Sequence, residues 1–128
     1  MAENKEKDFR IPQENSAGFI MLAEDVVTAI IGLAVTEVDG VAGLPGGITR
    51  DTVARLGKRS LSKVISVTYD ENKNVKVAVT VEVRFGVNIM EVSRNVQEKV
   101  RQALLTMLGI TAGEVSVRVA GIVLKEEA

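Results

Sequence analysis

The stretch VKVAVTVEVRF, residues 75–85, alternates valine, and finally phenylalanine, with charged, polar or small side chains. Successive side chains of a β-strand point to opposite faces, so this strict period of two predicts a strand with one buried face. The polar run DENKN at residues 70–74 is typical of a turn, and the β-branched run from Val64 to Tyr69 precedes it. The two runs are expected to pair as an antiparallel hairpin.

Two helices are expected, one before and one after this hairpin. The first covers residues 24–38, where apolar residues recur three and four apart, and Asp39-Gly40 is a typical stop. The second covers residues 88–108 and is amphipathic, with Asn88 as N-cap and Gly109 as C-cap. Because the first helix is apolar almost all round, we expect it to be buried on more than one side or to take part in assembly.

The remaining segments are shorter. The apolar run at residues 18–22 is a candidate first strand, and residues 115–124 alternate as a final strand. Residues 40–47 are rich in glycine and predict no regular structure. Residues 49–59 are expected to form a short helix, because an unstructured loop of about 20 residues is unusual in a compact domain.

The element order is therefore β-α-β-β-α-β, with the short helix after the first long one. The simplest packing is an α+β two-layer domain, in which two helices cover one face of a mainly antiparallel sheet. In a ferredoxin-like version, which we prefer, four strands form the sheet and each β-α-β crossover skips one strand. In the alternative, three strands from residue 63 onward form the sheet and the Phe19 segment extends its edge.

The domain is expected to span residues 16–124, after a flexible N-terminal tail at residues 1–15 and before a short solvated C-terminus at residues 125–128. The first residues mix charges of both signs, unlike a secretory signal. The longest uncharged apolar stretch, residues 26–36, is much shorter than the roughly 20 residues that cross a membrane. We therefore expect a cytoplasmic protein with no transmembrane segment, peripheral to the membrane at most and then through a partner.

The composition excludes several kinds of chemistry. The chain has 128 residues, a net charge of −1, and no histidine, cysteine or tryptophan. These absences exclude a thiol nucleophile, a histidine base, a zinc–thiolate site and a disulfide framework. Near Gly57-Lys58, a phosphate-binding P-loop fails at Thr52 and Arg59. We expect no catalytic residues, no metal and no cofactor, and nucleic acid is an unfavoured partner because the charge is near neutral.

Two surfaces are candidates for binding. A basic cluster falls at residues 50–63, opposed only by Asp51, and either faces water or contacts an anionic metabolite, lipid or RNA. It consists of Arg50, Arg55, Lys58, Arg59 and Lys63. The solvent face of the alternating strand is a candidate assembly surface, because mixed charges and small residues suit self-association. Its candidate contacts are Lys76, Thr80, Glu82 and Arg84.

Short motifs spread over residues 18–122 resemble the bacterial alkaline shock protein family, also called Gls-type general stress proteins. Each motif is weak alone, but their order and spacing are specific to the family. The matching pieces are Gly18-Phe19-Ile20, Glu24–Val27, Glu37–Gly43, Arg84–Ile89, Val96-Gln97, Met107–Gly109 and Val115–Ile122. The residue Ser116 departs from the asparagine that is common there.

The resemblance implies a non-enzymatic protein linked to general stress or the cell envelope. Members of the family can self-assemble or attach to the membrane through an anchoring protein, and no catalytic residues are agreed for them. We therefore expect a homo-oligomer that docks to a protein partner. The alternative is a ligand-binding or regulatory module that uses the basic cluster. The partner, the stress and the oligomer size are not indicated by the sequence.

Overall fold

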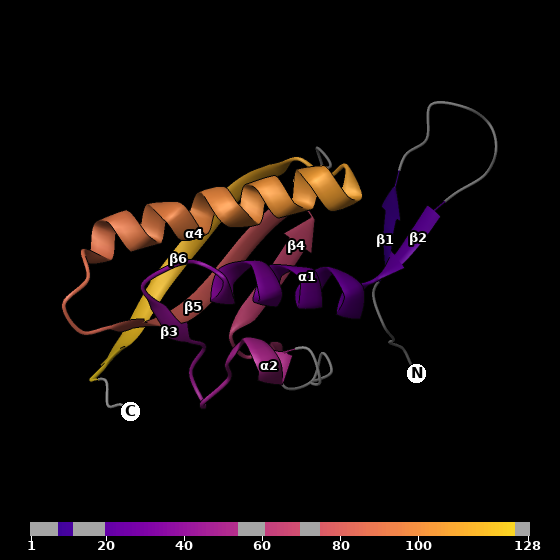
Figure 1. Ribbon diagram of the computed structural model, residues 1–128. Coiled ribbons are helices and arrows are strands. Elements are labelled where there is room, and N and C mark those ends of the chain that lie inside the picture. Colours follow the sequence, from indigo (N-terminus) through magenta and orange to yellow (C-terminus); the bar gives the residue numbers. More distant parts are fainter. Residues whose placement is uncertain (1–7, 12–19, 54–60, 70–74, 125–128) are drawn as a thin grey trace.

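The computed structural model describes residues 8–11, 20–53, 61–69 and 75–124 of the chain. It confirms the α+β class, with the helices and strands interleaved along the sequence (Figure 1). The elements are β1 (Asp8–Ile11), β2 (Ile20–Ala23), α1 (Glu24–Thr36), β3 (Val41–Gly43), α2 (Arg50–Val53), β4 (Ile65–Tyr69), β5 (Val75–Arg84), α4 (Ile89–Ala103), the π-helical turn η1 (Leu104–Leu108) and β6 (Ala112–Val123).

Strand β5 is the centre of the main sheet, as its alternating sequence predicts. On one edge it pairs with β6, in parallel and along its whole length. On the other edge it pairs antiparallel with β4 through residues 75–79 and with β3 through residues 82 and 83. The amides of Thr80 and Arg84 donate toward this second edge, to the carbonyls of Val64 and Gly40. Strands β4 and β3 therefore follow one another along the same side of β5.

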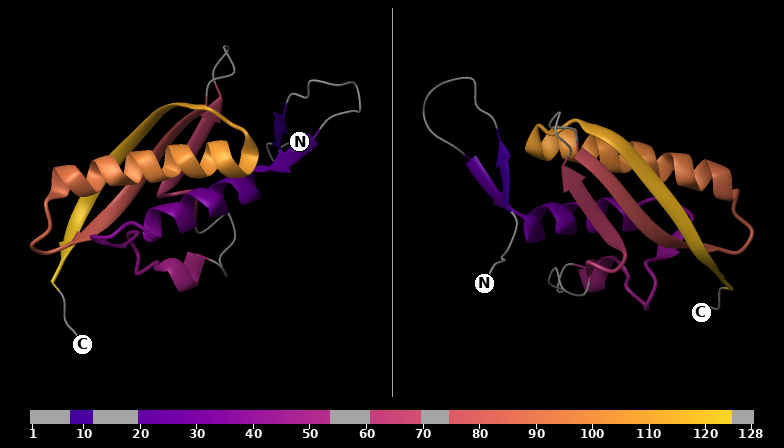
Figure 2. Two further views of the ribbon diagram at one scale, coloured as in Figure 1. Left: turned by 45° about the horizontal axis from the view of Figure 1, so that its top comes forward. Right: turned by 180° about the vertical axis from the view of Figure 1, so that it is seen from behind.

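The hydrophobic core lies between this sheet and the two long helices, α1 and α4. Both helices lie on the same side of the strands, which are uncovered by any described element when viewed from behind (Figure 2). The inward valines of β5 are at most 2% exposed, and the outward residues between them are exposed or half-buried. The helices contribute the buried residues Val27, Ile31, Val35, Val92, Val96 and Val100.

The ends of the second long helix lie where the sequence predicts them. The Asn88 side chain accepts a hydrogen bond from the Glu91 amide at 3.0 Å, which caps the first turn of α4. At the other end, η1 continues α4 to Leu108, and Gly109 follows with a φ of +69°. This left-handed conformation favours glycine and ends the helix.

The predicted place of the first strand is wrong. Strand β2 pairs only with β1, in a separate two-stranded sheet, because both edges of β5 are already occupied. As a result, the crossover through α4 joins neighbouring strands, β5 and β6, and does not skip one. Neither the four-strand ferredoxin-like order nor the alternative with the Phe19 segment on the sheet edge is found. Strand β1 falls within the expected tail, and the rest of that tail lies outside the described residues.

The glycine-rich residues 40–47 are more regular than predicted. Residues 41–43 form β3 against β5, and Leu44 and Ile48 then exchange backbone hydrogen bonds around a turn. The glycines allow this path, because Gly43 has a φ of +155° and would place a Cβ 2.6 Å from the Ile48 carbonyl oxygen. The segment therefore extends the sheet along β5 and also brings Val41 and Leu44 into the core.

Candidate functional site

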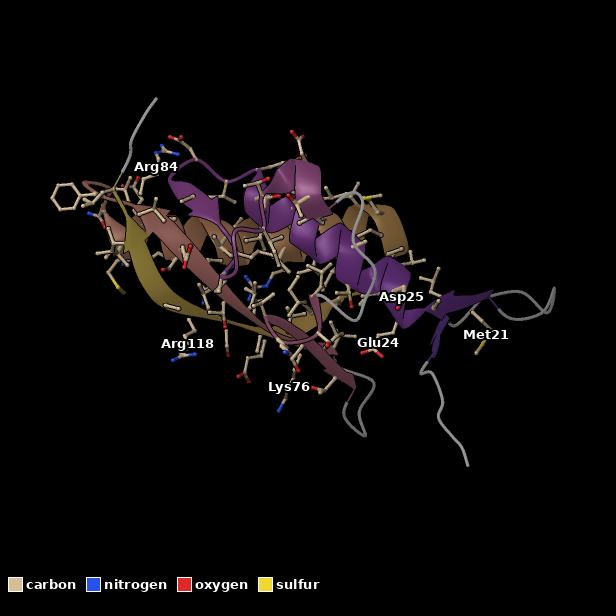
Figure 3. All side chains as sticks on the ribbon, turned by 90° about the horizontal axis from the view of Figure 1, so that it is seen from below. Met21, Glu24, Asp25, Lys76, Arg84 and Arg118 are labelled. Atoms are coloured by element: carbon tan, nitrogen blue, oxygen red, sulfur yellow. The ribbon has the colours of Figure 1, made fainter. Side chains whose placement is uncertain are left out.

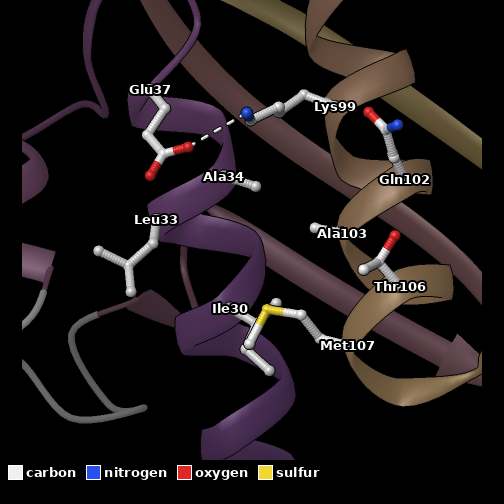
Figure 4. A pocket seen from close by; sticks show the side chains of 9 residues that line it. All are labelled: Ile30, Leu33, Ala34, Glu37, Lys99, Gln102, Ala103, Thr106 and Met107. Carbon is white, nitrogen blue, oxygen red and sulfur yellow. Dashed lines mark ion pairs between the residues drawn. The ribbon is translucent and has the colours of Figure 1, made fainter.

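A groove of about 450 Å³ runs between α1 and α4 on the outer side of the helix layer (Figure 4). Its walls are mostly apolar, and its lining comes from the two helices and η1. The residues that line it are Ile30, Leu33, Ala34, Glu37, Lys99, Gln102, Ala103, Thr106 and Met107. The groove is larger than a second hollow of about 180 Å³ near the start of α4.

The sequence of α1 explains the apolar wall. Residues 26–36 carry no charge, so the helix is apolar on the side that faces the sheet and on the side that faces away. Val27, Ile31 and Val35 are fully buried against the sheet. Ile30 and Leu33 remain half-buried in the groove. The expectation that this helix does more than fill one core is consistent with these half-buried side chains.

The opposite wall, from α4, becomes more apolar toward its end. Lys99 lies at one end of the groove, where its Nζ is 3.2 Å from Glu37 Oε1 on α1. Ala34 and Ala103 extend into the space between the helices and leave room there because they are small (Figure 4). At the other end, Met107 is 64% exposed. The groove therefore offers apolar surface with an ion pair at one end.

The four predicted contacts of the assembly surface all lie on the uncovered face of β5. Lys76 and Arg84 are exposed, and Thr80 and Glu82 are half-buried. Arg84 Nη2 is 3.1 Å from Asp39 Oδ1, so part of its charge is compensated within the chain. On the neighbouring strand β6, Glu114 lies opposite Lys76 and Arg118 lies opposite Thr80. Lys76 and Arg118 project outward from the strands (Figure 3).

The basic cluster is only partly described. Lys63 is exposed in the turn before β4. Arg50 begins α2, but the placement of its side chain lies outside the described part of the structure. Arg55, Lys58 and Arg59 lie wholly outside it. Their contact with an anionic ligand therefore stays a prediction.

A second, smaller hollow of about 180 Å³ lies where α4 begins, and its lining is more polar. Asp39, Asn88, Glu91 and Asn95 line it with Gly40, Val87 and Val92. Of these polar groups, Asp39 is paired with Arg84 and Asn88 caps the helix. Among the described residues, no three carboxylate, histidine or cysteine side chains come together as metal ligands do.

Several exposed apolar side chains were not anticipated. The alternation predicts that Phe85 is buried with the valines, but it is 70% exposed. Strand β5 ends at Arg84, and Gly86 turns the chain with a φ of +98°, so Phe85 belongs to the turn. Met90 at the start of α4 and Leu124 after β6 are exposed as well. The sequence pattern did not indicate that Met90 and Leu124 are exposed, because each residue lies next to the end of an element.

None of the helices in the described residues is both long and apolar enough to span a membrane.

Comparisons with known proteins identify relatives over most of the chain. It is 34% identical over 110 residues to the uncharacterized protein YqhY of Bacillus subtilis, which covers 86% of this chain and 81% of that protein. It is 35% identical over 107 residues to the uncharacterized protein Spy1614 of Streptococcus pyogenes, which covers 82% of this chain and 88% of that protein. No solved structure matches the chain. A family model described by a cell envelope-related function matches residues 12–124, and the chain thus belongs to this family, the alkaline shock protein 23 family.

Proposed function

We propose that this protein is a non-enzymatic, stress-related component of the cell envelope that works by binding copies of itself and a protein partner. It is peripheral to the membrane at most, and the partner holds it there. The family's cell envelope-related function supports the location. The mostly apolar groove between α1 and α4 supports binding as the mode of action.

The groove between α1 and α4 is the observation that carries the proposal. Its apolar walls lie on the outside of the helix layer, where Ile30 and Leu33 are half-buried and Met107 is exposed. Exposed apolar surface of this kind is stabilised when a partner covers it, since burial of apolar area is favourable by roughly 25 cal/mol per Å². The ion pair between Lys99 and Glu37 adds a polar end that can orient a partner.

The uncovered face of the sheet supports the second half of the proposal, self-assembly. Its side chains are small or mixed in charge, and no described element packs on them. Such a face has no apolar patch that must be kept from water, and it can contact another protein through its polar and charged side chains. The two surfaces lie on opposite sides of the molecule, so one copy can bind a partner and another copy together.

The groove is tested by Met107→Glu, which puts a charge on its exposed apolar end. We expect the variant to fold normally, because Met107 is 64% exposed. We expect the share of protein that sediments with the envelope of its native cells to fall several-fold, because a carboxylate is costly to bury under a partner. Cell fractionation with quantitative immunoblotting measures this share.

Met90→Glu is the matched control, since Met90 is 63% exposed on the same helix but lies outside the groove. It is expected to sediment as the unaltered protein does. Light scattering over a concentration series tests self-assembly separately. A protein that stays monomeric and never sediments with the envelope would contradict the proposal.

A further inference from the structure

We propose that two copies of this chain join through their β6 strands, which pair antiparallel about a two-fold axis at Ser116. The inference rests on the proposed self-assembly and names the element that performs it. Among the described residues, β6 pairs with β5 alone, so its outer edge has no strand beside it. A long unpaired edge is a template for another strand, and a second copy offers the same edge.

The regular part of this edge is bounded on both sides. The register of β6 against β5 shifts once between Val75 and Lys76 and once between Val81 and Glu82. Gly113 and Ala120 are therefore extra residues, which leaves residues 114–119 in unbroken alternation. A symmetric pairing of two β6 strands must fit inside this segment.

The hydrogen bonds of the sheet show which backbone groups of β6 face outward. The Thr80 and Arg84 amides of β5 donate toward β4 and β3, and the Phe85 amide donates toward β6. The backbone N–H and C=O groups of the odd-numbered residues of β5 therefore point toward β6. In a parallel ladder these groups bond to the backbone of Ser116 and Arg118. Val115, Val117 and Val119 direct their N–H and C=O groups to the outer edge.

The side chain of Gln97 supports this assignment. Its Nε2 donates to the Val115 carbonyl at 3.0 Å, reaching from α4 to a group on the outer edge. A carbonyl oxygen has two lone pairs, so Val115 can accept from Gln97 and from a second copy together. Gln97 thus holds one carbonyl of the edge in place and leaves Val117 open.

Charge selects one register for the pairing. In an antiparallel pair, opposite residues share a face, so the outward residues Glu114, Ser116 and Arg118 meet one another. Centring on Ser116 places Glu114 of each copy opposite Arg118 of the other. An axis two residues away, at residue 114 or 118, would place two glutamates or two arginines opposite each other. An axis one residue away, at residue 115 or 117, would place Glu114 or Arg118 opposite Ser116.

The partners within one chain leave these charges available. Glu114 accepts a hydrogen bond from Ser116 Oγ at 3.3 Å, and no ion pair within the described residues involves Arg118. In the dimer, Glu114 would lie between Lys76 of its own chain and Arg118 of the other. The uncovered faces of both copies would then form one continuous sheet surface, which includes Lys76 and Thr80 of the candidate assembly surface.

The first experiment is a charge exchange followed by analytical ultracentrifugation. Arg118→Glu places two like-charged pairs at the interface and is expected to weaken the dimer about tenfold or more. Glu114→Arg is expected to do the same. The double variant Glu114→Arg/Arg118→Glu restores unlike pairs and is expected to return the dissociation constant to within about threefold of the original. Both positions are exposed, and circular dichroism checks that each variant folds.

The second experiment tests the axis with a single thiol, because the chain has no cysteine of its own. In the proposed register, Ser116 of one copy lies opposite Ser116 of the other copy. The two residues form a non-hydrogen-bonded pair, in which Cα atoms are about 4.5 Å apart. Ser116→Cys is therefore expected to form a disulfide-linked dimer under mild oxidation. Ala78→Cys is the control, since Ala78 lies beside Ser116 on β5 but one strand further from the axis.

The outcomes separate this inference from the proposed function. Restoration by the double variant, with cross-linking at residue 116 and not at residue 78, supports pairing through β6. If the protein assembles but the charge variants change nothing, or both thiols cross-link equally, pairing through β6 is wrong while self-assembly stands. A protein that is monomeric at every concentration contradicts both.

Discussion

Gly40 holds the first helix against the second through a close contact that a larger residue would block. It follows α1 with a φ of +98°, and a Cβ at this position would lie 2.6 Å from Val92 Cγ2 on α4. Its carbonyl also accepts the Arg84 amide of β5. One glycine therefore places the end of α1, the start of β3 and the first turn of α4 relative to each other.

We expect Gly40→Ala to lower the free energy of unfolding by about 2–4 kcal/mol. About 1–2 kcal/mol comes from the left-handed backbone, and the overlap with Val92 adds the remainder. Urea denaturation measures the change. Gly46→Ala is the control, because Gly46 has a φ of +94° but open space around it, so only the backbone cost applies. Equal losses in the two variants would show that the contact with Val92 is unimportant.

Single residues were predictable where one local rule applies to them. Asn88 and Gly109 were identified as caps because each hydrogen-bonding or conformational need is met within a few residues of the chain. Phe85 was placed on the wrong side because alternation continues into it after the strand has stopped. What ends the strand is the turn at Gly86, and a period of two carries no information about that turn.

At the scale of elements, the N-cap of α4 fixes where the longest helix starts. Asn88→Ala removes the acceptor for the Glu91 amide and is expected to cost about 1 kcal/mol of stability. Thermal or urea unfolding gives the value. Asn95→Ala, an exposed change inside the same helix, should be neutral or slightly stabilising, because alanine has the higher helix propensity. A loss at residue 95 as large as that at residue 88 would count against a capping role.

The edge of β6 makes a second prediction about an element. We consider the Arg118→Glu variant as a monomer. The amide of Val117 is expected to exchange with solvent at least about tenfold faster than the amides of residues 116 and 118 on either side. The reason is that its N–H points away from β5. In the unaltered protein at high concentration, this difference should shrink as the second copy covers the edge. Residue-resolved hydrogen exchange by NMR measures both states, and slow exchange at Val117 in the monomer would contradict the assignment.

Elements were predictable when their own sequence is periodic, and their partners were not. Strand β5 and both long helices follow from residues 75–85, 24–38 and 88–108 alone. The pairing of β2 with β1 depends on which edges of β5 are already taken, and this is decided by β3, β4 and β6 together. Strand β3 was missed because it lies in a glycine-rich stretch, which usually breaks strands, although Val41 and Gly43 pair here with Val83 and Glu82.

At the scale of the whole molecule, one of the two uncovered surfaces was predictable. The outward face of β5, with Lys76, Thr80, Glu82 and Arg84, follows from alternation, and no element of the described residues packs on it. Its role in assembly stays a prediction. The groove could not be found from the sequence, because it exists only where Ala34 and Ala103, distant in the chain, bring small side chains together.

The position of β5 at the middle of the sheet also sets an order for folding during synthesis. The earlier strands β3 and β4 have no partner in the main sheet until residues 75–84 have been made. The far edge closes only after the chain has passed through α4 and reached residue 123. A ribosome must therefore translate nearly all of this domain before a stable fold can form. Until then, the apolar helix α1 has been synthesised but has no sheet to pack against.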